Sequence, residues 1–278
     1  MNRKTINDVL SILLYVIVFF LIQLVMTYIV GIADLLSSGA DTTQISHKLS
    51  TGTLPLDGKA LVTATVLSSV LAMSVFIWSK WAKVSRSWLA THPWVTLVWV
   101  ALAALGTIIP SEWIEETMAL SMPEGTEKLF EDIMSQPLGY MSLGILAPLA
   151  EELVFRGAVL RKLLSMFDKR WHWVPIAISA IIFGAAHLNL PQFVHATLIG
   201  LLLGWMYYRT DSILPGVLFH WVNNTVAYLM FHLMPQMNDG KLIDLFHGSH
   251  GMVAASLLFS VCILAPSLFQ LATRLKKA

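Results

Sequence analysis

Three apolar stretches of this sequence contain acidic, basic, imidazole and amide side chains. In chain order these residues are Glu151, Glu152, Arg156, His187, His220, Asn223 and Asn224. A charged group inside a membrane-spanning helix costs about 2.5–3.5 kcal/mol on insertion scales, so such groups are functional candidates when they face one another or a wet cavity. A carboxylate, imidazoles and an amide are also the groups that can activate water and stabilise an oxyanion, which indicates hydrolysis of an amide bond.

Helical geometry separates the two adjacent glutamates. Successive residues of an α-helix are rotated by about 100°, so Glu152 and Arg156 share a face while Glu151 points elsewhere. Arg156 can then neutralise Glu152 through a two-point hydrogen bond, and this pair would hold the site together or bind the substrate backbone. Glu151 is left as a buried carboxylate with no local partner, which makes it the candidate general base.

The remaining polar residues supply the other parts of a hydrolytic site. His220 and Asn224 are four residues apart and share a helix face, where they offer two hydrogen-bond donors to a developing oxyanion. Glu151, together with His187, would position and deprotonate a water molecule. The alternative is structural, because single histidines and asparagines in membrane helices often join two helices by a hydrogen bond. We interpret His195 in that way rather than as a cavity-lining residue.

The same residues form three short motifs in a fixed order. Glu151-Glu152-Leu-Val-Phe-Arg156 reads EExxxR, Phe183-Gly-Ala-Ala-His187 reads FxxxH, and His220-Trp-Val-Asn-Asn224 reads HxxxN. On helices of a multi-span protein they resemble the CPBP family of intramembrane proteases, which includes the type II CAAX prenyl endopeptidases, bacteriocin-processing and immunity enzymes and the Abi proteins. The resemblance implies an eight-helix bundle in which the first glutamate and the middle histidine activate water. It also implies that the last histidine and the asparagine form the oxyanion site.

Two alternatives stay open at this stage. Glu151, His187 and His220 could form a zinc site with one open position. We favour a metal-free mechanism without a cofactor, because Asn224 is a natural oxyanion donor. A proton-coupled membrane transporter could use the same buried residues as a relay, although many such proteins contain inverted repeats and this sequence has no evident repeat.

The elements that must position these residues are membrane helices. The sequence is 56% hydrophobic and only 13% charged, whereas soluble domains contain about 25% charged residues. Since about 20 apolar residues cross a bilayer, the apolar runs predict an all-α, polytopic bundle of about eight transmembrane helices in a single domain over residues 1–278. The spans are expected at 9–31, 60–79, 94–111, 137–158, 174–189, 191–208, 212–233 and 251–272. Within them, residues 137–233 would be the catalytic core.

The distribution of charge predicts how this bundle is oriented in the membrane. Basic residues such as Arg161, Lys162, Lys169 and Arg170 fall in the segments that are inside when the N-terminus is inside, so we expect both termini in the cytoplasm and the protein in the plasma (inner) membrane. The net charge of +1 gives no reason to expect nucleic acid. Membrane lipid and a membrane-associated peptide or protein substrate are the expected partners. Gly200 and Gly204 have the GxxxG spacing of closely packed membrane helices.

Overall fold

The computed structural model describes residues 3–51, 56–83, 87–234 and 241–277. Over these ranges the chain is helical and contains no strand, which confirms the predicted all-α class. The long helices are α1 (Arg3–Ser37), α3 (Gly58–Trp78), α5 (Trp94–Thr117), α10 (Leu190–Thr210), α11 (Leu214–Leu233) and α13 (His250–Arg274). The shorter elements are α2 (Thr42–Thr51), α4 (Ser87–Ala90), α6 (Glu124–Met134), α9 (Trp173–Ala185), α12 (Leu242–Leu245) and the 3₁₀ turn η3 (Lys169–Trp171).

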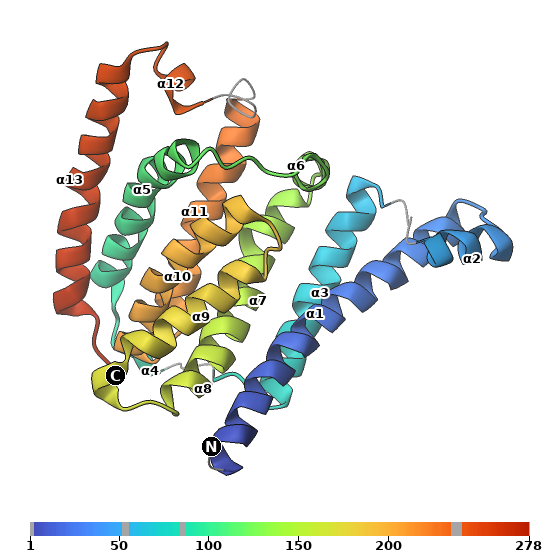
Figure 1. Cartoon of the computed structure of the whole chain (residues 1–278), viewed down its shortest axis with the longest axis horizontal. Coiled ribbons are helices and arrows are strands. Elements are labelled where there is room, and N and C mark those ends of the chain that lie inside the picture. The colour runs from blue at the N-terminus through green and yellow to red at the C-terminus, as the bar shows by residue number, and fades with distance from the viewer. Residues whose placement is uncertain (1–2, 52–55, 84–86, 235–240, 278) are drawn as a thin grey trace.

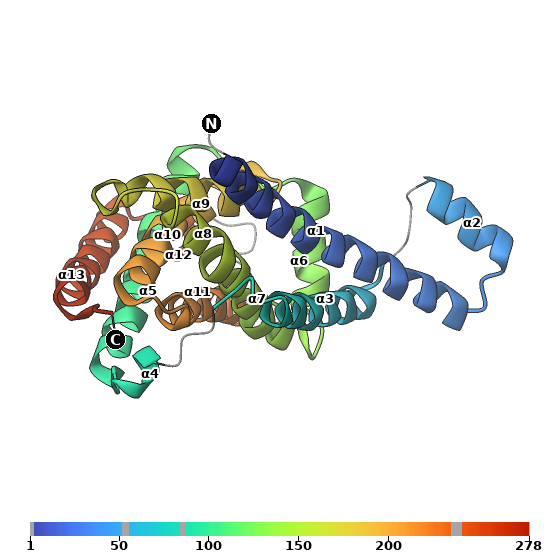
Figure 2. The same cartoon turned by 90° about the horizontal axis from the view of Figure 1, so that it is seen from below.

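One further helix carries the glutamates and lies near the middle of the bundle. It consists of the π-helix η1 (Tyr140–Leu146), α7 (Ala147–Val154), the π-helix η2 (Phe155–Leu160) and α8 (Arg161–Leu164). Figures 1 and 2 show this helix together with α9, α10 and α11 in the centre, with α1 and α3 on one side and α5 and α13 on the other. The motif-bearing helices therefore lie between two pairs of helices that carry no motif.

Five of the described helices are long and apolar enough to cross a membrane, namely α1, α3, α5, α10 and α13. Each of the other three predicted spans also contains helix, but α9 has only 13 residues and α11 carries the polar HxxxN motif. The count of about eight transmembrane helices is therefore not confirmed. The beginning of α1 and the end of α13 lie at the same end of the bundle (Figure 1), as an even number of crossings requires.

A proline removes the π-helical hydrogen-bond donor of one backbone carbonyl in the glutamate-bearing helix. In a π-helix each N–H bonds to the carbonyl five residues back, and Ala147 donates to Ser142 in this way. The equivalent donor for Leu143 would be residue 148, which is Pro148 and has no N–H. The carbonyl of Leu143 is therefore available to a side chain from another helix.

Small residues let α9 and α10 pack closely. A Cβ added at Gly200 would lie 3.1 Å from Cβ of Ala180, and one added at Gly204 would lie 3.0 Å from Cγ2 of Ile176. Both distances are tighter than ordinary side-chain contacts, so a larger residue would push the helices apart. The structure thus confirms the close packing that the GxxxG spacing predicts.

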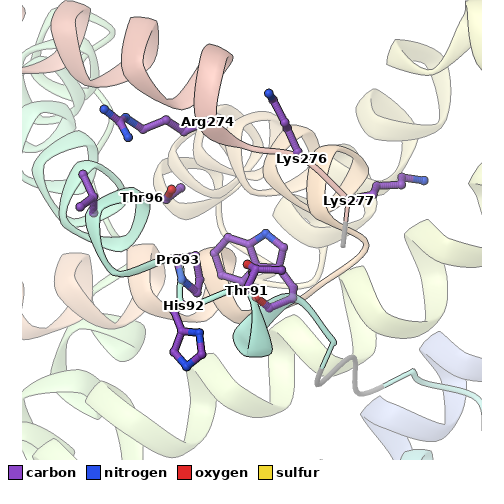
Figure 3. A pocket seen from close by; sticks show the side chains of 9 residues that line it. Thr91, His92, Pro93, Thr96, Arg274, Lys276 and Lys277 are labelled. Atoms are coloured by element: carbon purple, nitrogen blue, oxygen red, sulfur yellow. Dashed lines mark hydrogen bonds between the residues drawn. The ribbon is translucent and has the colours of Figure 1, made fainter.

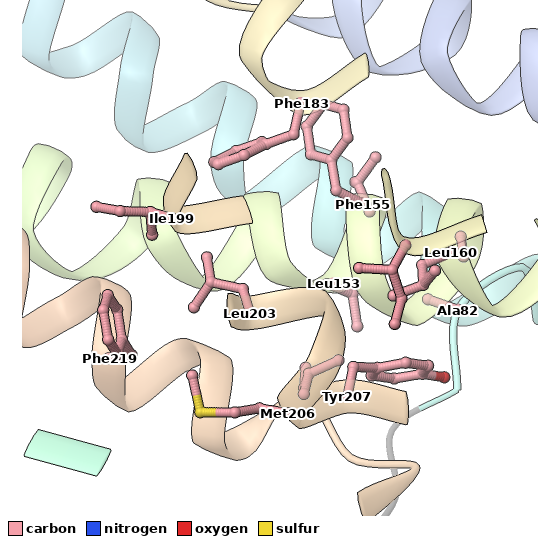
Figure 4. Packing of buried hydrophobic residues seen from close by; sticks show 14 of the residues in the cluster. Ala82, Leu153, Phe155, Leu160, Phe183, Ile199, Leu203, Met206, Tyr207 and Phe219 are labelled. Atoms are coloured by element: carbon pink, nitrogen blue, oxygen red, sulfur yellow. The ribbon is translucent and has the colours of Figure 1, made fainter. Parts of the chain in front are cut away.

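A cluster of buried apolar side chains joins the central helices. Leu153 and Phe155 contribute from the glutamate-bearing helix, Phe183 from α9, Leu203 from α10 and Phe219 from α11 (Figure 4). Within lipid, where the surroundings are as apolar as the side chains, such a cluster stabilises the fold mainly through close van der Waals packing. This packing fixes the distance between α7 and α11, which carry the polar residues of the site.

Candidate active site

The structure brings Glu151 and His220 together from two different helices. Nε2 of His220 lies 3.7 Å from Oε2 of Glu151, and Nδ1 of the same ring lies 3.6 Å from Oε1 of Glu152. Both separations are longer than a hydrogen bond, but catalytic hydrogen bonds are often long before substrate binds. The imidazole of His220 is thus placed between two carboxylates, in a site whose Glu151 side chain remains 22% exposed.

Glu152 and Arg156 form the ion pair that their spacing predicts. Nη1 of Arg156 lies 2.6 Å from Oε1 of Glu152, and the two side chains are only 1% and 0% exposed. The sequence predicted that both carboxylate oxygens of Glu152 accept from Arg156, and this prediction is wrong. Oε2 of Glu152 is buried and has no hydrogen-bond partner in the described part of the chain. The second terminal nitrogen of Arg156 donates instead to the carbonyl of Gly200, 3.4 Å away. The arginine therefore ties α10 to the glutamate-bearing helix.

Glycine at position 216 allows α11 to approach this ion pair. A Cβ at Gly216 would overlap Oε2 of Glu152 and lie 3.2 Å from its Cδ. The first turn of α11 therefore rests directly against the carboxylate, and His220 follows one turn later on the same face. Sequence reasoning gave Gly216 no role, because only the tertiary structure shows what faces it.

Phe183 is a second residue whose role the sequence did not indicate beyond its place in the FxxxH motif. The guanidinium carbon of Arg156 lies 4.3 Å from the centre of the Phe183 ring, within cation–π range. The rings of His187 and His220 both pack edge-on against Phe183, with centroids 5.1 and 5.9 Å away. One aromatic side chain therefore supports the arginine and both histidines of the motifs.

His187 lies just beyond the C-terminal end of α9, in the link to α10. Its Nδ1 lies 2.9 Å from the carbonyl of Phe183. Because a carbonyl only accepts, this nitrogen carries the hydrogen, and Nε2 is the nitrogen left for a further contact. Asn189 holds the link by donating to the His187 carbonyl at 2.9 Å and by capping the start of α10. His187 forms no ion pair within the described residues, so its pairing with Glu151 stays a prediction.

Asn224 is held by the carbonyl that Pro148 leaves without a donor. Its Nδ2 donates to the carbonyl oxygen of Leu143 at 2.9 Å. A side-chain amide has two N–H groups, so one of them fixes Asn224 against η1 while the other remains for a further acceptor. This geometry is compatible with the predicted role of Asn224 as an oxyanion donor.

His195 and Asn223 form a separate polar contact that joins three helices. Nδ1 of His195 lies 2.9 Å from Oε1 of Glu115 on α5, and its Nε2 lies 3.3 Å from Nδ2 of Asn223 on α11. The interpretation of His195 as a helix–helix hydrogen-bonding residue is confirmed. The contact ties α11 to α10 and, through His195, to α5.

The donor atoms do not match the zinc alternative. Within the described residues, no group of three or more His, Cys, Asp or Glu side chains is arranged to hold a metal ion. Glu151, His187 and His220 therefore do not form the three-ligand arrangement that a catalytic zinc would require. The chemistry of this site is accordingly derived from its own side chains.

An all-helical membrane fold with a carboxylate and an imidazole close together between its central helices is typical of intramembrane enzymes and of transporters. Comparison with known proteins is more specific. Residues 134–226, which include all three motifs, match the family described as Type II CAAX prenyl endopeptidase Rce1-like. The chain belongs to the CPBP family of membrane proteases, to which these endopeptidases also belong. The prediction from the three motifs is thereby confirmed.

Two relatives show how far the similarity extends. The chain is 28% identical over 107 residues to the putative membrane peptidase YdiL of Bacillus subtilis (strain 168). The aligned region covers 38% of this chain and 43% of that protein. The chain is 30% identical over 160 residues to an uncharacterised 24.3 kDa protein of Escherichia coli, covering 52% of this chain and 72% of the relative. The alignment with YdiL thus spans less than half of that protein. No solved structure matches the chain.

Proposed function

We propose that this protein is an intramembrane endopeptidase that hydrolyses a peptide bond in a membrane-associated or lipidated peptide or protein. The observation that carries this proposal is the meeting of Glu151 and His220, 3.7 Å apart, beside the buried Glu152–Arg156 pair. Membership of a protease family favours this function over the transporter alternative. Because the Glu151 side chain is partly exposed, a water molecule can reach its carboxylate.

In the proposed reaction Glu151 is the general base. Its carboxylate takes a proton from a water molecule as the water oxygen bonds to the scissile carbonyl carbon. The lone pair on Nε2 of His187 would help to orient that water. The proton held by Glu151 then passes to the amine as the carbon–nitrogen bond breaks, which restores the carboxylate.

The oxyanion of the tetrahedral intermediate needs donors that are already in place. Asn224 supplies its second amide N–H, the one that is not donated to the Leu143 carbonyl. His220 supplies a ring N–H from the same face of α11. Glu152 and Arg156 hold this face in position through the close approach of Gly216. The second carboxylate is thus proposed to position the catalytic groups rather than to react.

We further propose that both chain termini lie in the cytoplasm and that the membrane is the plasma membrane. The beginning of α1 and the end of α13 lie at one end of the bundle (Figure 1). Basic residues lie at the helix ends found there, such as Arg3 at the start of α1, Lys80 just after α3 and Arg274 at the end of α13. The positive-inside rule assigns such an end to the cytoplasm.

The direct test uses purified protein in lipid nanodiscs and a quenched fluorogenic peptide carrying a lipidated C-terminal tail. Glu151→Gln, which keeps the size of the side chain, is expected to lower kcat by about 10²–10⁴-fold, the usual contribution of a general base. The matched control is Glu124→Gln in the exposed first turn of α6, which is expected to keep wild-type activity. Mass spectrometry of membrane peptides from cells with wild-type or Glu151→Gln protein would identify the natural substrate. Unchanged turnover in a well-folded Glu151→Gln protein would overturn the assignment of the base.

A further inference from the structure

A cavity unrelated to the glutamates lies at the end of the bundle where α13 finishes. It has a volume of about 370 Å³, opens to the outside, and is lined by residues of α4, of the start of α5 and the segment before it, and of the end of α13 and the chain that follows. Its polar lining consists of Thr91, His92, Thr96, Arg274, Lys276 and Lys277. Figure 3 shows the three basic side chains on the end of α13 and its tail, and the others at the start of α5 and in the segment before it.

The tail that carries the two lysines is fixed rather than loose. Leu275 is fully buried, and its carbonyl accepts hydrogen bonds from Nε and Nη2 of Arg209 at 3.1 and 2.9 Å. Arg209 also donates to the carbonyl of Ala272 at 2.9 Å, so it caps the last turn of α13. The backbone that leads to Lys276 and Lys277 is thereby anchored beside the cavity.

The charged side chains that line the cavity, Arg274, Lys276 and Lys277, are all basic. None of the described residues that line it is acidic. Arg274 uses its Nε to donate to Gln270 at 2.8 Å, which leaves its terminal nitrogens available. The ammonium of Lys277 lies 5.7 Å from the centre of the Tyr208 ring, which lines a neighbouring cavity that Lys277 also borders. Thr91 donates its hydroxyl hydrogen to the carbonyl of Trp88, so Thr96 is the hydroxyl donor of the described lining. Cations beside a hydroxyl, in the absence of carboxylates, suit a phosphate group, which arginine can hold by two parallel hydrogen bonds.

Exposed apolar side chains beside the cavity distinguish a lipid from a soluble phosphate. Val95 lines the cavity and is 56% exposed, and one turn further along α5 Val98 is 58% exposed. Phe269, on the last turns of α13, is 67% exposed. Acyl chains can lie along these faces while the headgroup occupies the cavity. The buried Trp88 and the exposed Trp94 lie beside the cavity, and tryptophan is enriched at the depth of the membrane–water interface.

We propose that this cavity binds the phosphate of an anionic lipid headgroup. Clusters of lysine and arginine at the ends of membrane helices attract anionic lipids, and basic pockets between such helices bind their headgroups. The site lies at the opposite end of the bundle from α6 (Figure 1) and does not involve the residues of the proposed active site.

The test measures lipid retention by native mass spectrometry of the full-length protein, with phosphatidylglycerol and phosphatidylcholine as probes. Wild-type protein is expected to retain phosphatidylglycerol in preference to phosphatidylcholine. The triple variant Arg274→Gln, Lys276→Gln and Lys277→Gln is expected to bind phosphatidylglycerol at least about tenfold more weakly, because each cation contributes to attraction of an anionic lipid. If the triple variant folds poorly, the double variant Lys276→Gln and Lys277→Gln, at two exposed positions, is measured in its place.

The matched control removes three exposed basic residues at the same end of the bundle that do not line the cavity, with Arg3→Gln, Lys80→Gln and Arg161→Gln. This control is expected to keep the preference for phosphatidylglycerol. Equal loss in both triple variants would mean general surface attraction, and no loss in either would mean no site, so both results overturn the proposal. Thermal stabilisation by inorganic phosphate equal to that by phosphatidylglycerol would assign the cavity to a soluble phosphate and overturn the lipid. None of these measurements depends on protease activity.

Discussion

Nδ2 of Asn224 donates to the carbonyl oxygen of Leu143 at 2.9 Å, across the interface of α11 and η1. That carbonyl is available because the residue five positions later is Pro148, which has no N–H to offer it. A proline in one helix therefore sets the orientation of an amide in another. The relationship links the backbone of the glutamate-bearing helix to the proposed oxyanion donor.

The first prediction is that Pro148→Ala lowers kcat without a comparable change in KM. Alanine supplies an N–H that competes for the Leu143 carbonyl, so Asn224 loses its fixed orientation, and we expect kcat to fall by about tenfold, the value of a displaced hydrogen bond of about 1.4 kcal/mol. Steady-state kinetics on the lipidated peptide provide the measurement.

A double-mutant cycle separates this effect from general damage to the helix. In an Asn224→Ala background there is no amide left to misplace, so Pro148→Ala is expected to have little further effect on kcat. Fully additive losses in the two single variants and the double variant would show that Pro148 acts by another route.

The second prediction concerns the buried ion pair. Glu152→Gln leaves the guanidinium of Arg156 buried without its countercharge, and removal of one partner of a buried pair costs about 3–5 kcal/mol. We expect a large decrease in the thermal unfolding temperature of the purified protein, together with a loss of activity. Asp168→Asn is the control, because the Asp168–Arg170 pair is 3.5 Å long and more than 70% exposed, and exposed pairs contribute about 0–1 kcal/mol. Equal stability of the two variants would mean that the buried pair does not support the fold.

The sequence predicted those features of the site that depend on spacing along one helix. The contact of Glu152 with Arg156 and the close packing at Gly200 and Gly204 follow from residues four apart, and the structure confirms both. The order of the three motifs was sufficient to identify the family. Such features are local, so they do not require knowledge of how the helices pack.

The particular contacts by which separate helices meet at the site were not predicted. The position of His220 between two carboxylates requires that Gly216 let α11 come close to Glu152, and no spacing rule reveals that contact. The π-helical turns around α7 change which carbonyls are free, and their occurrence is not a matter of hydropathy. The polar residues of the motifs also lower the hydropathy of α11, so the helices that carry the site are the least evident as membrane spans.

The third prediction tests the different roles that the sequence and the structure give to His187 and His195. His187→Ala is expected to reduce kcat by about 10²–10⁴-fold with little change in stability, because the residue lies at a helix end and its ring would act on water. His195→Ala is expected to keep most of the activity but to lose about 1–3 kcal/mol of stability, since Glu115 and Asn223 lose their shared partner. Activity and thermal unfolding are measured on both variants. The reverse pattern would exchange the roles of the two residues.

The fourth prediction tests the approach of α11 to the ion pair. A methyl group at position 216 would overlap Oε2 of Glu152, and because the carboxylate is held by Arg156 the helix must move instead. Overpacking of this kind typically costs about 1–3 kcal/mol, so Gly216→Ala should lower the unfolding temperature and move His220 away from Glu151, with a loss of activity. Gly125→Ala in α6 is the matched control, since a Cβ there would meet nothing within 4 Å. That control should be neutral or stabilising by up to about 1 kcal/mol, because alanine restricts the unfolded chain. A Gly216→Ala protein as active and stable as wild type would show that the carboxylate can move aside, and that the contact with α11 does not position His220.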